Sequence, residues 1–155
     1  MRRATLLAML AVLLASSLVT AGPAAAAAGV SLTGGAGRVV MTIRGALLGT
    51  LDHGRLTIRV EGSETQVYVD GATLRQRTMP DGRVVYSGTA LRFRVFRGGW
   101  RVVIDGSGIN ASAGGRGVVS LRGTGRYSVD GAAPVPWNSS WQVIRLGPRS
   151  SRGSR

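Results

Sequence analysis

The fold is decided by the stretch GRVVMTIRGALLGTLDHGRLTIRVEG, residues 37–62. Apolar residues occupy every second position in each half of it: Val39, Met41 and Ile43, then Leu56, Ile58 and Val60. A period of two places these side chains on one face of an extended strand. The stretch therefore predicts two half-buried strands, with a turn around His53.

The same alternation continues along the chain. Its apolar positions are Leu91, Phe93 and Val95, then Trp100, Val102 and Ile104, then Val119 and Leu121, and finally Tyr127 and Val129. Helical spacing is absent from residues 29–155, and the chain holds 24 glycines, each of which would cost a helix about 1 kcal/mol. An all-β domain follows.

Turn residues separate these strands at short intervals. The clearest turn is Met79–Gly82, where proline is placed to begin a turn and glycine to leave it. Glycine pairs at 98–99 and 114–115, and the glycines at 123 and 125, fit tight hairpins. We expect a single antiparallel sandwich or partly closed barrel of about ten short strands, with a short β-solenoid as the alternative.

A faint internal repeat runs through this pattern. Shifting the chain by 61 residues lays 37–62 over 98–123 and matches Gly37, Gly45, Gly54 and Gly62 with Gly98, Gly106, Gly115 and Gly123. The repeat predicts two duplicated β-units, with residues 73–96 as an inserted hairpin or bridging strands. Recurrent hairpin chemistry is the other interpretation.

The two ends differ from the middle. Arg2 and Arg3 precede an apolar run and then a series of small residues, so residues 1–28 are predicted to be a secretion signal peptide cleaved after Ala28. Residues 29–146 form the β-domain, and residues 147–155 a basic, disordered tail. We expect a secreted or cell-envelope location, with no membrane span once the signal is removed.

The charge is strongly positive. All 20 basic residues are arginines against 7 acids, a formal net charge of +13. Six arginines lie opposite the apolar face of their strands and are the candidate anion-binding residues: Arg44, Arg59, Arg92, Arg94, Arg101 and Arg122. They suit an anionic envelope polymer or lipid head groups. A solvated, compositional arginine surface is the other interpretation. Specific nucleic-acid recognition is not expected, because no aromatic stacking platform accompanies the arginines.

Catalytic chemistry finds few residues here. The chain has no Cys and one His, which excludes thiol catalysis and zinc fingers. His53 has no nucleophile elbow to serve, and the acids lie mostly beside glycine. We predict no catalytic residues, no metal ligands and no cofactor, and hence a protein that is not an enzyme.

Three segments carry a family resemblance: residues 45–55, residues 91–94, and residues 106–117 with their sequence GSGINASAGGRG. Together they resemble small exported β-rich proteins of high-GC Gram-positive bacteria, which have no assigned function. The piece Gly108-Ile109-Asn110 is also similar to the head-GIN adhesin domains, which are β-solenoids. The resemblance implies export and a β-fold.

Two functions remain from the sequence. The first is an exported, non-catalytic β-domain that associates with anionic cell-envelope components through an arginine-rich sheet face. The second is a structural or adhesive module that binds protein, with the charge serving solubility.

Overall fold

The computed structural model describes residues 28–147. The predicted signal peptide and basic tail therefore lie outside the described residues, apart from Ala28 and Gly147. Within that range all regular structure is β, as expected. No helix there is long and apolar enough to cross a membrane.

Seven strands form one antiparallel sheet that does not close. They are β1 (Gly29–Glu61), β2 (Gln66–Asp70), β3 (Arg75–Thr78), β4 (Val84–Phe96), β5 (Gly99–Val129), β6 (Val135–Trp137) and β7 (Gln142–Leu146). The predicted strands are fewer and longer than the ten expected, because β1 and β5 continue through the bends at which hairpins were predicted.

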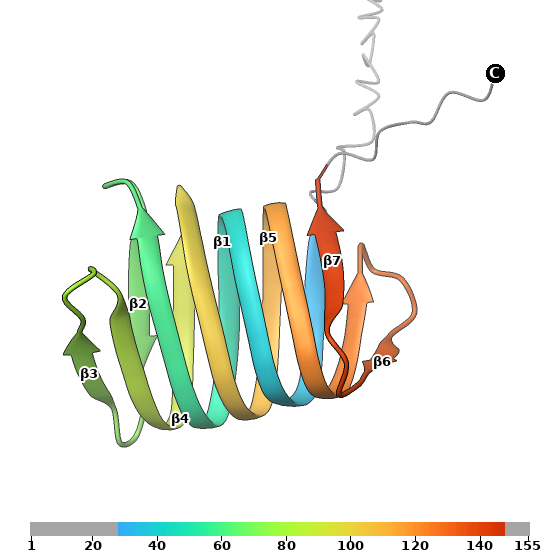
Figure 1. Cartoon of the computed structure of the whole chain (residues 1–155), viewed down its shortest axis with the longest axis horizontal. Coiled ribbons are helices and arrows are strands. Elements are labelled where there is room, and N and C mark those ends of the chain that lie inside the picture. Colours follow the sequence, from blue (N-terminus) through green and yellow to red (C-terminus); the bar gives the residue numbers. More distant parts are fainter. Residues whose placement is uncertain (1–27, 148–155) are drawn as a thin grey trace, which may run out of the picture.

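The two long strands wind around a common core as an antiparallel pair (Figure 1). Val39 of β1 pairs with both Ile104 and Leu121 of β5, which are 17 positions apart. Ile104 in turn pairs with both Val39 and Leu56, again 17 positions apart. One turn of the coil therefore takes 17 residues of each strand, and turns of β1 and β5 alternate along it.

Each turn bends at two corners, and glycine occupies them. Along one edge of the coil Gly123, Gly37, Gly106, Gly54 and Gly88 are cross-strand neighbours in that order. Gly54 has a φ of +145°, which L side chains rarely adopt, and its Cα lies against the backbone of β5. A side chain at this position would separate the strands, so glycine is required where the ladder bends.

This geometry explains the internal repeat. The matched glycines at 37, 45, 54 and 62, and at 98, 106, 115 and 123, are spaced by 8, 9 and 8 residues, close to half of a 17-residue turn. The repeated segments do not form separate units, because β1 and β5 are interwoven along their whole length. The predicted bridging segment supplies β3 and β4, and β4 pairs with β1 where a further turn of β5 would lie.

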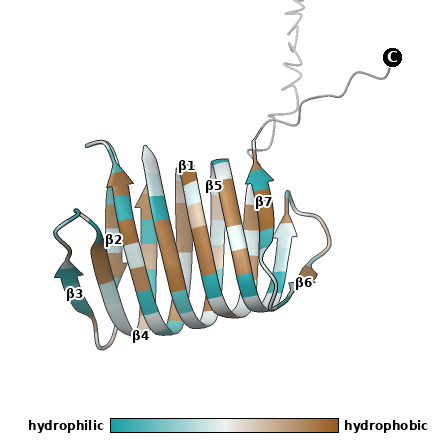
Figure 2. Ribbon diagram, in the orientation of Figure 1, coloured by the Kyte–Doolittle hydropathy of each residue, from teal (hydrophilic) through white to brown (hydrophobic). Residues whose placement is uncertain are grey.

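The coil is flattened into two layers (Figure 1). The front layer consists of β3, residues 84–87, 55–61, 99–105, 38–44 and 116–122, and β7, in that spatial order. The back layer consists of β2, residues 89–96, 46–53, 107–114, 29–36 and 124–129, and β6. Hydrophobic and hydrophilic residues alternate along both layers (Figure 2).

The predicted inward-facing residues form the core between the layers. Met41, Phe93, Trp100 and Ile104 are buried, and no polar or charged residue of the described range is buried with them. Val60 is the exception, with 42% of its surface exposed, because β1 ends one residue later and no turn covers it. Trp137 closes the core at the β6 end.

Candidate functional site

Cross-strand register gathers the arginines into rows across the front layer. Arg59 of β1 lies opposite Arg101 of β5, and Thr42, Val118 and Arg145 continue the same row. Four residues further along the strands, Arg122, Arg38, Asp105, Arg55, Ser87 and Arg75 form a second row. Partners directly opposite each other project to the same side of a sheet. The two rows therefore face the same solvent, roughly 13 Å apart.

A third, shorter row pairs Arg44 with Arg116, beside Gly99 and Glu61. We call the arginines of this layer the front-layer arginines: Arg38, Arg44, Arg55, Arg59, Arg75, Arg77, Arg101, Arg116, Arg122 and Arg145. All are exposed. Asp105 and Glu61 are the carboxylates that share the rows, so the layer is strongly positive.

One ion pair reduces that charge. Arg38 Nε lies 3.3 Å from an oxygen of Asp105, and both side chains keep much of their surface in water, 55% and 41% respectively. No other front-layer arginine forms an ion pair within residues 28–147. Such an exposed pair contributes at most about 1 kcal/mol to stability. The remaining guanidinium groups are free to meet an external anion.

A band of apolar residues runs between the first two arginine rows. Val40 pairs with Ser120 and Val103, and Val103 with Thr57, which pairs with Val85. These side chains are half-buried. Val143 on β7 extends the band at one end and is 61% exposed. The front layer thus presents a flat apolar strip between two rows of positive charge.

The six candidates predicted from the sequence divide between the layers. Arg44, Arg59, Arg101 and Arg122 belong to the front layer, whereas Arg92 and Arg94 lie on the back layer. All six are exposed, as expected. The sequence therefore identified outward-facing arginines, but it did not show that two of them occupy a different surface.

Six front-layer arginines were missed: Arg38, Arg55, Arg75, Arg77, Arg116 and Arg145. Arg38 and Arg55 alternate with core residues in the fold-deciding stretch, so that signal was present. The others stand on short strands or beside a glycine corner, where the alternation is too brief to assign a face.

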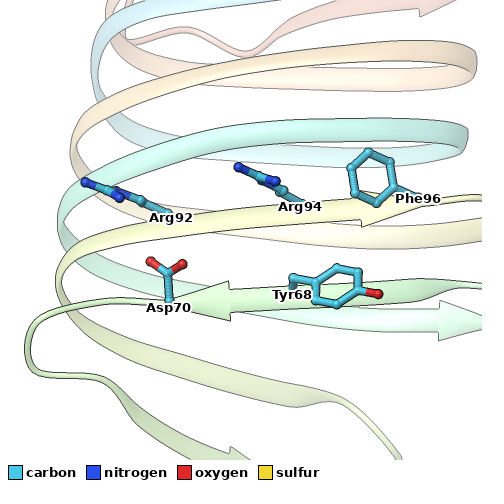
Figure 3. Close-up of a pocket in the computed structure, with 5 residues that line it drawn as sticks. All are labelled: Tyr68, Asp70, Arg92, Arg94 and Phe96. Atoms are coloured by element: carbon cyan, nitrogen blue, oxygen red, sulfur yellow. The ribbon is translucent and has the colours of Figure 1, made fainter.

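Arg92 and Arg94 line an open pocket on the back layer, together with Tyr68, Asp70 and Phe96 (Figure 3). Its volume is about 340 Å³. Asp70 is the cross-strand partner of Arg92, and Tyr68 is that of Arg94. The pocket brings two guanidinium groups, one carboxylate and two aromatic rings to the outer surface of β2 and β4.

Other chemistry is sparse. No three His, Asp or Glu side chains of the described range gather closely enough to hold a metal ion. His53 does not lie in a turn as predicted; it is an exposed residue within β1, beside the Gly54 corner. The histidine is positioned there because β1 bends without ending.

Comparison with known proteins adds no relative: no family model, curated protein or solved structure matches this chain.

Proposed function

We propose that this protein is an exported, non-catalytic β-domain that binds an anionic polymer of the cell envelope along its front layer. The observation that supports it most is the concentration of charge: ten of the 15 arginines among residues 28–147 occupy one layer, which carries two carboxylates in its rows. A compositional excess of arginine would place comparable numbers on both layers.

The shape of this surface favours an extended ligand. Neighbouring strands are about 4.8 Å apart, so arginines in one row are spaced at intervals of roughly 5 to 10 Å across the sheet. A linear polymer with one charged group per repeat unit can meet several of them in succession. The planar guanidinium group binds phosphate or carboxylate through two parallel hydrogen bonds.

The predicted signal peptide selects the polymers that matter. Outside the cytoplasm, the abundant polyanions are phosphate- or carboxylate-bearing wall polymers and anionic lipid head groups. These share the same recognition chemistry, and we propose the wall polymer as the partner, because the front layer is flat and most of its apolar band is half-buried rather than projecting. Insertion into a bilayer would call for protruding apolar side chains.

Retention of the purified protein on immobilised poly(glycerol phosphate), measured between 20 and 300 mM salt as a choice of range, tests the proposal. The double variant Arg59→Gln with Arg101→Gln removes two adjacent front-layer charges. The matched control, Arg97→Gln with Arg126→Gln, removes two charges outside the front layer. The front variant should lower the slope of log affinity against log salt by roughly 1.5 to 2, and the control by much less.

Two results would contradict the proposal. Equal losses in both double variants would mean that only net charge matters. Absence of binding at the lowest salt, where electrostatic attraction is least screened, would remove it altogether. Vesicles containing phosphatidylglycerol, tested in parallel, separate the two sources of phosphate: tighter binding to vesicles than to the polymer would favour lipid.

One observation favours the second function, a structural or adhesive protein-binding module. Trp141 and Val143, at and just before the edge strand β7, are 48% and 61% exposed, and Val118 of β5 lies diagonally beside Val143. Exposed apolar side chains next to a strand edge can pair with a second copy of the chain. This function predicts salt-insensitive self-association in sedimentation, which Val143→Lys would abolish; a monomer at high concentration would contradict it.

A further inference from the structure

We propose that the back-layer pocket formed by Tyr68, Asp70, Arg92, Arg94 and Phe96 is a binding site for a sugar acid, such as a hexuronate unit of a glycan. The proposal is independent of polymer binding by the front layer, since its five residues all lie on β2 and β4 of the opposite layer (Figure 3). Each part of such a ligand has a complementary group in the pocket.

The carboxylate of the ligand is recognised by Arg92 and Arg94. They stand two positions apart on β4, so their side chains project from the same face, about 7 Å apart at the backbone. Both are exposed, and no ion pair within the described range engages either guanidinium group. Two unpaired guanidinium groups this close together repel each other, and a bound carboxylate relieves the repulsion.

The ring of the ligand rests against the aromatic side chains. Tyr68 lies opposite Arg94 and exposes 59% of its surface, although a domain with 5% aromatic residues uses most of them in its core. Phe96 is half-buried at the end of β4 and completes the apolar wall. A flat aromatic surface beside polar groups suits the CH face of a pyranose ring, and the Tyr68 hydroxyl can bond to its substituents.

Asp70 decides between a sugar acid and an aromatic acid. It lies opposite Arg92, and as an ionised carboxylate it only accepts hydrogen bonds. A sugar acid offers hydroxyl groups that donate to it, whereas an aromatic monocarboxylate offers no donor and is repelled. The combination of two cations, an acceptor and an apolar wall therefore selects a ligand that has both hydroxyls and a negative charge.

The size and position of the pocket agree with one sugar unit within a longer chain. Its volume of about 340 Å³ lies at the small end of the range for small-molecule sites, roughly 300 to 1,000 Å³. β2 is the outermost strand of the back layer, so the pocket is open along the sheet edge and neighbouring units can extend past it.

Titration of the ¹⁵N-labelled protein, followed by amide chemical shifts, tests the site with glucuronate, glucose and benzoate as probes. Glucuronate should shift amides of residues 66–70 and 92–96 and bind roughly tenfold or more tightly than glucose or benzoate. The proposal is overturned if benzoate or glucose binds as well as glucuronate, or if the glucuronate shifts fall on the front layer.

Substitutions assign the roles. Arg94→Gln and Tyr68→Ala should each weaken glucuronate binding roughly tenfold, while Arg126→Gln, an exposed back-layer control outside the pocket, should change it less than about twofold. Asp70→Asn should weaken glucuronate and strengthen benzoate. Loss of both ligands in Asp70→Asn, or equal weakening by Arg126→Gln, would refute the site. Because the Arg59 and Arg101 variants leave this pocket intact, failure here and failure of front-layer binding are distinguishable.

Discussion

Gly54 of β1 lies directly beside Gly106 of β5 at a corner of the coil, so close that a Cβ atom on Gly54 would stand 2.8 Å from the Cα atom of Gly106. The carbonyl oxygen of Asp105 would be closer still. This contact between two backbones lets both strands change layer without breaking their hydrogen-bonded ladder. The front and back surfaces therefore depend on it.

Gly54→Ala should destabilise the domain by roughly 3 kcal/mol or more, because the new methyl group meets backbone on the facing strand and the positive φ adds strain. Gly114→Ala is the matched control: its φ is ordinary, and the nearest atom to an added Cβ, the oxygen of Ala28, is 3.9 Å away. Urea unfolding measures both. A loss below about 1 kcal/mol for Gly54→Ala would contradict the corner geometry.

Two buried tryptophans should respond differently to replacement by phenylalanine. The indole N–H of Trp100 donates to the carbonyl oxygen of Gly45 at 3.1 Å, whereas that of Trp137 has no hydrogen-bond partner within the described residues. Trp100→Phe should therefore cost about 1 to 2 kcal/mol more than Trp137→Phe in the free energy of unfolding. Equal costs in thermal or urea unfolding would count against this difference.

Asp105→Asn should strengthen binding of a phosphate polymer. It removes a carboxylate from the middle of an arginine row and releases Arg38 from its ion pair. Stability should change by less than about 1 kcal/mol, since that pair is exposed. Asp52→Asn makes the same change in net charge on the back layer. If the two variants gain affinity equally on the polymer column, position does not matter and the row has no special role.

Burial raises the pKa of Tyr86, so the folded protein holds this proton to higher pH than the unfolded chain does. The contribution to stability is complete below the ordinary pKa of 10.0 and is lost as the pH rises above it. Tyr86→Phe should therefore lose less stability than the parent between pH 8 and pH 11, chosen to bracket that value. The urea midpoint at each pH measures this, and parallel decline in both proteins would exclude Tyr86 as the cause.

Local alternation was sufficient to predict the core. Met41, Phe93 and Trp100 follow the period of two, and burying them needs no information beyond their own strands. The hairpin at Met79–Gly82 was also predictable, because its residue types specify a turn directly: the amide of Gly82 bonds to the carbonyl of Met79 at 3.0 Å.

The corners were not predictable in the same way. Gly114–Gly115 and Gly123–Gly125 carry the composition of hairpin turns, yet they lie inside β5, where the chain bends and continues. The same glycine serves a turn or a corner according to what its neighbours pair with. The internal repeat recorded the corner spacing, but its meaning required the 17-residue register.

By itself, the sequence determined that the chain is all-β, which side chains face inward, and that arginines face outward, because each of these properties depends on local composition and on the two-residue period of a strand. Only the tertiary structure decided that ten arginines share the front layer while Arg92 and Arg94 share a pocket with Tyr68 and Asp70. Those groupings arise from pairings between residues far apart in the chain, and such register is set by the winding of β1 around β5.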